Sequence, residues 1–455
     1  MAALACPAPG ARRAPLAVRP LRPAPRPPEG LLDAAWASLR AAVAAAFGEE
    51  EPAPGAREEA YRLVETLCLN GQAASLARRL SEECTARARA RLRLLAPAAA
   101  APPGSGAELL ERLQGAWAGH CRAMLGISEV FLYLNQTHLR GHPEGAARCL
   151  EERGTQIFRQ CLAELPEVQE RAVLLVLDLI DSQRRGQEDA AGPSPAPYVS
   201  MLLRLGIYED CLEPGLVRRT AEFYRVESEE LLGRTRAPAY LLHCERRLNE
   251  EQARCAEDLE GRSAAAVLAA AREELWGRHC GRVLEADLGG LVAQGGLENL
   301  GRLHRLCGQV GTLPLLCKSW GASIRCAGAA VLAVGDDPEE SKNAIPGLVS
   351  LRAKLFGIVD EAFQGCSTFR LATKAALEEL LGRAPQNRPA KLLARYLDEV
   401  LRGERGREEV DAIIAGAIGI FSHLAAKDAF EAFFRKDLAR RLLHPRGLRR
   451  APSLQ

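Results

Sequence analysis

The segment from Lys427 to Leu443, KDAFEAFFRKDLARRLL, limits what this chain can fold into more than any other stretch. Its large apolar residues recur at steps of three and four, which places them on one face of an α-helix. These residues are Phe430, Phe433, Phe434, Leu438, Leu442 and Leu443. An ordinary amphipathic helix that packs against a protein core would show the same pattern. The spacing alone therefore predicts a helix and does not predict a function.

The 455-residue chain as a whole has the composition of a soluble, helix-rich protein. Hydrophobic residues make up 47% of it and aromatic residues only 5%, so leucine and alanine must build most of the core. Its length allows a sizeable core and suggests about two to four domains. The formal net charge is only +2, so we expect no general attraction to nucleic acid or to a membrane surface.

The fourteen cysteines are widely spaced and form neither a C-x-x-C motif nor a cluster with histidines. This pattern indicates reduced thiols in a cytosolic or nuclear protein and predicts no metal site. His120 and Cys121 are neighbours, but adjacent helical residues point about 100° apart and no further ligands lie near them in the sequence. We therefore expect no metal, no cofactor and no catalytic residues.

Glycine, proline and alanine mark the expected breaks between segments. The glycine pairs at 289–290 and 295–296 are interpreted as helix ends and turns, because no phosphate-binding glycine motif follows a predicted strand. The stretch APAAAAPPGSG, residues 96–106, is expected to be a loop. The longest apolar runs, such as 173–177, are too short to cross a bilayer, and the N-terminus lacks the apolar run of a signal peptide.

Helical periodicity dominates the chain, and strand signals are few. Residues 1–30 hold eight prolines and predict an extended arm that is mostly disordered when free. After it, the apolar spacing predicts helices over 31–47, 56–69, 72–95 and 109–125.

The literal string at 427–443 resembles D-V-F-E-A-F-Y-K-K-D-L-A-K-R-L-L of the cullin family, and most closely that of its cullin-4 branch. Shorter matches support it. WAGHCR at 117–122 is similar to the family segment W-Q-D-H-C-R, and VFLYLNQT at 130–137 is similar to I-F-L-F-L-D-R-T. NRPAKLLAR at 387–395 is similar to N-K-P-A-E-L-I-A-K. The resemblance extends over approximately residues 16–443 and is weakest over 263–385.

This resemblance implies an all-α fold, an elongated stalk of three cullin repeats (helical bundles) followed by the first helix of the cullin C-terminal domain. The expected domains are the arm at 1–30, repeats at 31–153, 154–262 and 263–385, and a truncated start of the C-terminal domain at 386–455. The implied function is that of a non-catalytic scaffold of a cullin-RING E3 ubiquitin ligase. We expect it in the nucleus and cytoplasm.

The resemblance also implies a partner, because the cullin-4 branch grips a triple-propeller substrate adaptor with its N-terminal arm and the second and fifth helices of its first repeat. The matching positions in this sequence are Leu16, Val18, Tyr61, Val64, Glu65, Phe131, Asn135 and His138. Tyr61 and Phe131 could equally be aromatic residues of the core.

Two further expectations concern the C-terminal end and an alternative class. In cullins the RING subunit is bound, and the ubiquitin-like modifier attached, far beyond the helix that ends here at Leu443. As given, the chain is therefore expected not to recruit a RING subunit or to be neddylated, and to expose Phe430, Phe433 and Phe434. A helical-rod tethering protein of vesicle traffic would show the same leucine and alanine periodicity, and stays open as an alternative.

Overall fold

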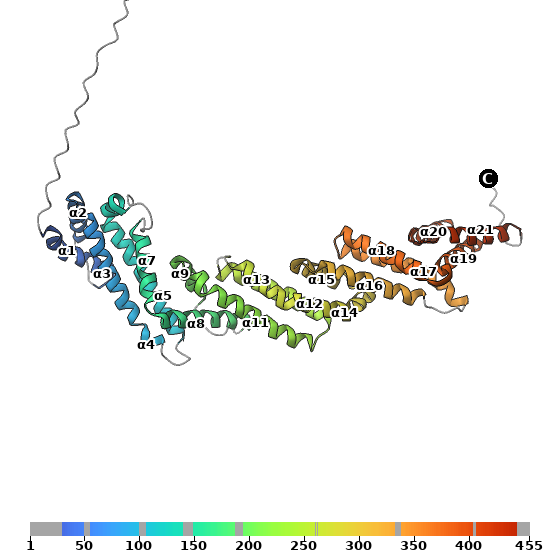
Figure 1. The fold of residues 1–455 in the computed structure, drawn as a ribbon, viewed down its shortest axis with the longest axis horizontal. Coiled ribbons are helices and arrows are strands. Elements are labelled where there is room, and N and C mark those ends of the chain that lie inside the picture. Colours follow the sequence, from blue (N-terminus) through green and yellow to red (C-terminus); the bar gives the residue numbers. More distant parts are fainter. Residues whose placement is uncertain are drawn as a thin grey trace, which may run out of the picture. The chain divides into compact units, whose positions relative to one another are not determined.

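A computed structural model shows helices joined by short turns (Figure 1). The structure describes residues 30–49, 55–99, 106–139, 149–186, 194–259, 261, 263–332, 338–403 and 406–443. No β-strand occurs in these ranges, so the predicted all-α class is confirmed. The predicted arm, with Leu16 and Val18, lies outside the described residues except for Gly30. None of the helices in the described ranges has the length and apolar character needed to cross a membrane.

The chain divides into two compact units, Met1–Leu212 (unit 1) and Glu213–Gln455 (unit 2). This division falls inside the expected second repeat, 154–262. Compactness follows packing density and not the repetition of a sequence pattern, so the three repeat boundaries stay a prediction.

Unit 1 confirms the four helices predicted over 31–47, 56–69, 72–95 and 109–125. Its described elements are α1 (Leu31–Ala46), α2 (Ala56–Leu69), α3 (Ala73–Arg93), α4 (Ala96–Ala99), α5 (Gly106–Val130), α6 (Leu132–Leu134), the π-helical turn η1 (Asn135–Leu139), α7 (Leu150–Ala163), α8 (Pro166–Arg184), α9 (Ala196–Leu205) and α10 (Tyr208–Cys211). The expected loop at 96–106 is wrong at both ends, since α4 covers 96–99 and Gly106 opens α5. Alanine is the strongest helix former, and Pro97 stands in a first turn, where its missing N–H is tolerated.

The long helices α3 and α5 both pack against α7, and this contact is unusually close. A Cβ atom on Gly154 of α7 would lie only 2.5 Å from Met124 Cγ on α5, so glycine is needed for the approach. Beside it, Trp117 meets Phe158 edge to face with ring centroids 5.0 Å apart. These contacts fix the α5–α7 pair, and both α2 and α9 pack against α5.

Unit 2 continues the helical pattern to the end of the described chain. Its elements are α11 (Glu213–Leu232), α12 (Ala237–Asp258), α13 (Ala264–Arg272), the π-helical turn η2 (Glu273–Gly277), α14 (Cys280–Gln294), α15 (Leu297–Val310), α16 (Leu313–Leu332), α17 (Pro338–Glu361), α18 (Ser367–Arg383), the 3₁₀ turn η3 (Pro385–Asn387), α19 (Arg388–Arg402), α20 (Arg407–Phe421) and α21 (Lys427–Leu443). The helix predicted from the 427–443 string is therefore confirmed.

The two glycine pairs of unit 2 behave differently. Gly295 has a left-handed φ of 70° and ends α14, and Gly296 precedes α15, as predicted for a turn. Gly289 and Gly290 lie inside α14, so their interpretation as a helix end is wrong. The leucines of that helix are buried, and this packing outweighs the cost of about 1 kcal/mol for a glycine in a helix.

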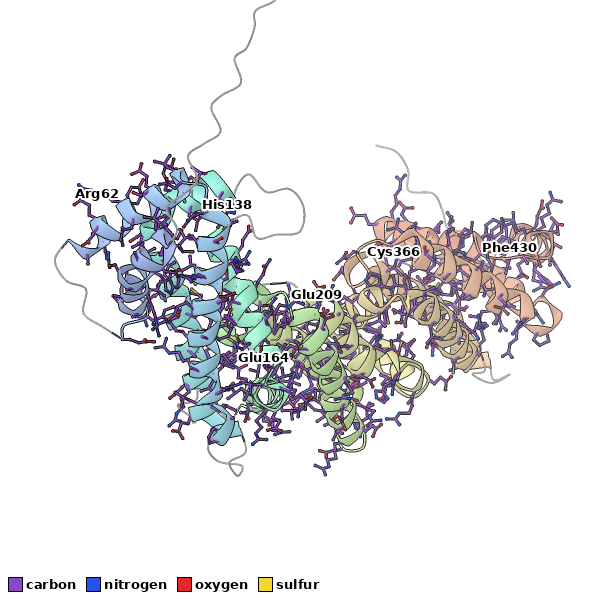
Figure 2. All side chains as sticks on the ribbon, turned by 60° about the vertical axis from the view of Figure 1, so that its left-hand side comes forward. Arg62, His138, Glu164, Glu209, Cys366 and Phe430 are labelled. Atoms are coloured by element: carbon purple, nitrogen blue, oxygen red, sulfur yellow. The ribbon has the colours of Figure 1, made fainter. Side chains whose placement is uncertain are left out.

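The apolar face of α21 is covered only in part. The helix packs against α19, and Phe430, labelled in Figure 2, lies 5.1 Å from Phe421 and 5.7 Å from Phe434 between ring centroids. None of its described side chains is fully buried, and Phe430, Phe433 and Phe434 are half-buried. The expectation of a freely exposed face is therefore met only partly, because α19 shields one side of it.

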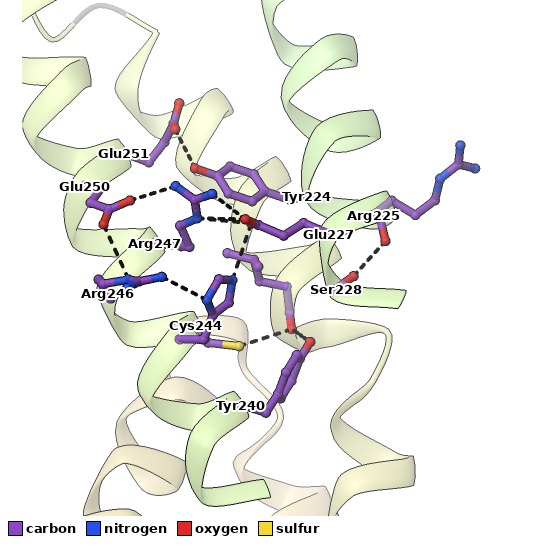
Figure 3. Close-up of polar contacts among 12 residues, drawn as sticks. Tyr224, Arg225, Glu227, Ser228, Tyr240, Cys244, Arg246, Arg247, Glu250 and Glu251 are labelled. Carbon is purple, nitrogen blue, oxygen red and sulfur yellow. Dashed lines mark hydrogen bonds and ion pairs between the residues drawn. The ribbon is translucent and has the colours of Figure 1, made fainter. Parts of the chain in front are cut away.

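A polar network joins α11 and α12 (Figure 3). The Arg247 guanidinium donates to both oxygens of Glu227, at 2.9 and 3.1 Å, and to Glu250 at 2.9 Å. His243 Nε2 lies 3.4 Å from the same Glu227 carboxylate. Burial raises the pKa of Glu227, but hydrogen bonds and charges from His243 and Arg247 outweigh it and hold the pKa below its usual range.

This network predicts acid sensitivity. A carboxyl group with a lowered pKa stabilises the fold above its unfolded pKa, and the contribution is lost as the pH falls through its folded pKa. Unit 2 should therefore lose stability progressively as the pH falls below 4.5, the ordinary value for Glu227. In urea denaturation followed by circular dichroism, Glu227→Gln should reduce the unfolding free energy at about pH 7 and reduce it less at about pH 4. Glu257→Gln, an exposed change on α12, is the control. If Glu227→Gln reduced the unfolding free energy equally at both pH values, the lowered pKa of Glu227 would not explain the acid sensitivity.

Candidate functional site

The described residues of the predicted adaptor-binding set lie on α2 and in the segment 131–138 of unit 1. Tyr61, Val64 and Glu65 belong to α2, which packs against α5 and α6. Phe131 follows α5 directly, and His138 lies in η1. Figure 2 labels His138, and Arg62 beside Tyr61 on α2, at the end of unit 1 that lies away from Glu164. The fold thus brings the two sequence segments to one region.

α2 has a clear inner and outer side. Ala60, Val64 and Leu67 are buried at spacings of four and three, which is the inward stripe of the helix. Tyr61 and Glu65 lie one turn apart on the other side and are half-buried. The same four-residue step continues to Leu69, whose exposed fraction is 69%. Tyr61, Glu65 and Leu69 therefore form one outward stripe.

Phe131 and Asn135 are internal. Phe131 is fully buried at the end of α5. Asn135 Nδ2 donates to Ser128 Oγ at 3.3 Å, and its Oδ1 accepts from the Leu150 N–H at 3.1 Å. Leu150 is the first residue of α7, so Asn135 ties the start of α7 to the end of α5. Burial leaves Phe131 and Asn135, like Val64, no surface for a partner, and they support the region from within.

The predicted contact set therefore narrows to Tyr61, Glu65 and His138, and two leucines extend it. Leu132 on α6 is 40% exposed beside α2, and Leu69 completes the stripe described above. We call Tyr61, Glu65, Leu69, Leu132 and His138 the α2/α6 surface. Sequence reasoning missed both leucines, although the step from Glu65 to Leu69 was available as a signal.

The charges next to the α2/α6 surface are held weakly. Arg62 pairs with Glu58 at 2.7 Å, and Arg57 lies 3.9 Å from Glu129, with all four side chains largely exposed. Such exposed pairs contribute about 0–1 kcal/mol, so a partner can displace them at little cost. An aromatic ring, two exposed leucines and adjustable charges suit protein binding, and they provide no arrangement for catalysis.

His120 and Cys121 do not form a catalytic pair. His120 is buried, and its Nε2 shares a hydrogen bond of 2.9 Å with the Gly154 carbonyl oxygen, which occupies it structurally. Burial raises the pKa of the Cys121 thiol, with Arg204 acting in the opposite direction. Within the part of the chain that the structure describes, no group of three or more His, Cys, Asp or Glu side chains could hold a metal ion.

Comparison with known families gives one match over most of the chain. A family described as the cullin alpha solenoid domain matches residues 36–449. The match includes every described residue of the α2/α6 surface and the string at 427–443.

Individual relatives agree with this match. The chain is 27% identical over 432 residues to Cullin-4A of Homo sapiens, which covers 94% of this chain and 55% of that protein. It is 27% identical to Cullin-4 of Dictyostelium discoideum, with 94% and 52% covered. Cullin-3B of Arabidopsis thaliana is 27% identical over 350 residues, with 74% and 47% covered. The chain thus spans about half the length of the curated relatives it matches.

Proposed function

The chain belongs to the cullin family, and on this premise we propose that it is a scaffold subunit of a cullin-RING E3 ubiquitin ligase in ubiquitin-dependent protein degradation. The observation that carries the proposal is the family match across residues 36–449. The scaffold itself catalyses nothing, and ubiquitin transfer is performed by the partners that it holds. We place its action in the nucleus and cytoplasm.

A scaffold of this kind acts through proximity. Two partners bound to one chain meet at an effective concentration set by the chain that joins them, which reaches the millimolar range for short connections. Closely packed helices such as α5 and α7 suit this role, because a stiff support keeps a bound partner at a defined position.

We propose that the α2/α6 surface binds a triple-propeller substrate adaptor, together with the N-terminal arm that contains Leu16 and Val18. Support comes from the outward position of Tyr61, Leu69 and Leu132 on neighbouring elements. Aromatic residues dominate binding energy at many interfaces, where surrounding apolar contacts exclude water. Glu65 and His138 would then form part of the polar rim.

Removing the apolar contacts of this surface should weaken adaptor binding. We expect Tyr61→Ala combined with Leu69→Ala to reduce affinity about 10- to 100-fold, equivalent to about 1.4–2.7 kcal/mol. Surface plasmon resonance with the purified adaptor measures the loss. Leu174→Ala is the matched control, because Leu174 is also an exposed leucine of unit 1 and lies on α8. Deleting residues 1–30 tests the arm separately.

Different outcomes would contradict the proposed binding surface and the proposed scaffold function. If the adaptor binds the double variant and the wild type equally, the α2/α6 surface is wrong, while the scaffold proposal stands. If affinity capture from cell extract retrieves membrane tethers and no ubiquitin-ligase components, the vesicle-tethering alternative replaces the scaffold proposal.

A further inference from the structure

A cavity of about 230 Å³ opens between α5, α7 and α9 of unit 1. Its lining residues are Trp117, His120, Cys121, Arg122, Met124, Leu125, Glu151, Thr155 and Arg204. None of them belongs to the α2/α6 surface, so the inference does not rest on adaptor binding. The volume is below the roughly 300–1,000 Å³ of pockets that hold drug-sized ligands. It suits one large side chain of a partner.

The floor of this α5/α7/α9 cavity is apolar and already in place. Trp117 and Met124 are buried, and the Trp117 ring is fixed by its edge-to-face contact with Phe158 at 5.0 Å. The hydrogen bond between His120 Nε2 and the Gly154 carbonyl oxygen, 2.9 Å long, fixes the neighbouring ring. When a ligand enters a preformed pocket, few protein side chains must be ordered, so the entropy cost of binding is small.

The rim of the cavity carries positive charge that a partner can reach. Arg122 and Arg204 are exposed, and neither has a carboxylate partner within the described ranges. Several other arginines of unit 1 are paired with a carboxylate, for example Arg89 with Glu164 at 2.6 Å. The Arg204 guanidinium lies 5.4 Å from the centre of the Trp117 ring, directly at the apolar floor. Among the nine lining residues Glu151 is the single acid, so the arginines set the sign of the charge.

From this arrangement we propose that the cavity docks an acidic peptide segment of a partner protein, anchored by one aromatic side chain. The aromatic ring packs against Trp117 and Met124, and exposed Leu125 covers its outer edge. Carboxylates on either side of the ring accept hydrogen bonds from Arg122 and Arg204, in the forked geometry that guanidinium groups favour. A basic peptide of the same shape is repelled.

The sequence supplies a specific probe, because it contains only three methionines, Met1, Met124 and Met201. Met124 lines the cavity, whereas Met201 is buried on α9 and does not line it. In the full chain labelled with [methyl-¹³C]methionine, the peptide acetyl-Asp-Glu-Phe-Asp-Glu-amide should shift the Met124 signal saturably and leave Met201 in place. Met124→Leu assigns the signal. The same peptide with alanine for phenylalanine, and acetyl-Lys-Lys-Phe-Lys-Lys-amide, should produce no saturable shift.

Charge reversal tests the rim. Arg204→Glu and Arg122→Glu should each weaken the peptide at least tenfold. Arg112→Glu is the matched control, since Arg112 is an exposed arginine on α5, the helix of Arg122, and does not line the cavity. An unshifted Met201 signal shows that each variant is folded. The proposal is overturned if no peptide moves the Met124 signal, if the alanine peptide or inorganic phosphate moves it equally, or if Arg112→Glu weakens binding as much as Arg204→Glu.

Discussion

Replacing Phe363 by alanine should lower the unfolding free energy of unit 2 by about 3–5 kcal/mol. Phe363 stands in the turn between α17 and α18 and is 0% exposed. Its ring centroid lies 4.7 Å from Phe369, 5.1 Å from Trp320 and 5.3 Å from His304, so α15, α16 and α18 meet around it. Truncation would leave a cavity among rings that cannot collapse into it.

The surroundings of Phe363 explain why the cavity should stay open. Trp320 Nε1 donates to Thr373 Oγ1 at 2.9 Å, and that hydroxyl donates to the Phe369 carbonyl oxygen at 2.8 Å. The first bond holds the Trp320 ring in position, because moving that ring would break it, and the second bond fixes the hydroxyl that accepts it. The cost of a large-to-small change rises with the cavity that remains, so this site belongs in the upper part of the range.

Hydrogen exchange resolved by mass spectrometry measures this effect in each unit separately. Amide exchange in α16 and α18 should become faster by roughly 100- to 4,000-fold, as 1.4 kcal/mol corresponds to a factor of about ten. Peptides from α3 in unit 1 serve as an internal reference and should be unchanged. Leu371→Ala is the control variant, since Leu371 is 67% exposed on α18 and should change exchange by less than a factor of about three. Similar effects of the two variants would contradict the packing argument.

Much of the fold could be predicted from residue spacing. The 427–443 string repeats its apolar residues at helical steps, and the structure places α21 over the same residues. Spacing failed at Gly289 and Gly290, because a glycine pair is a local signal and the buried leucines of α14 decide the outcome. It also gave no sign of the cluster around Phe363, since Trp320 and Thr373 are brought together from 53 positions apart.

The candidate site could be predicted only as a region. Matching the sequence to a family pattern proposed α2 of unit 1 as part of the site, but a match does not say which side of that helix faces outward. The apolar step from Ala60 to Val64 and Leu67 did carry that information, and it would have moved Val64 to the core. Asn135 was beyond such reasoning, because its buried role depends on Ser128 and on the start of α7.

The second large effect is expected at Glu251, a carboxylate inside unit 2. Its side chain is 1% exposed. Tyr224 Oη donates to it at 2.6 Å, and the Arg254 guanidinium donates to the same oxygen (Figure 3 shows the tyrosine contact). Taking a charge out of water costs several kcal/mol, and these hydrogen bonds offset that cost. The buried Glu251 carboxylate is therefore stable only while Tyr224 and Arg254 donate to it.

Removing one member of such a set should cost more than the bond it made. Glu251→Ala leaves the Arg254 charge, which is 12% exposed, without this carboxylate, and should lower the unfolding free energy by about 3–5 kcal/mol. Tyr224→Phe deletes one hydrogen bond to a charged group and should cost about 1.5–3 kcal/mol. Urea denaturation of both single variants and the double variant gives their coupling energy, expected at about 1–3 kcal/mol. Glu257→Ala, exposed on the same helix, should cost less than about 0.5 kcal/mol. Strictly additive losses in the double variant would show that tyrosine and carboxylate act independently, against the arrangement seen between α11 and α12.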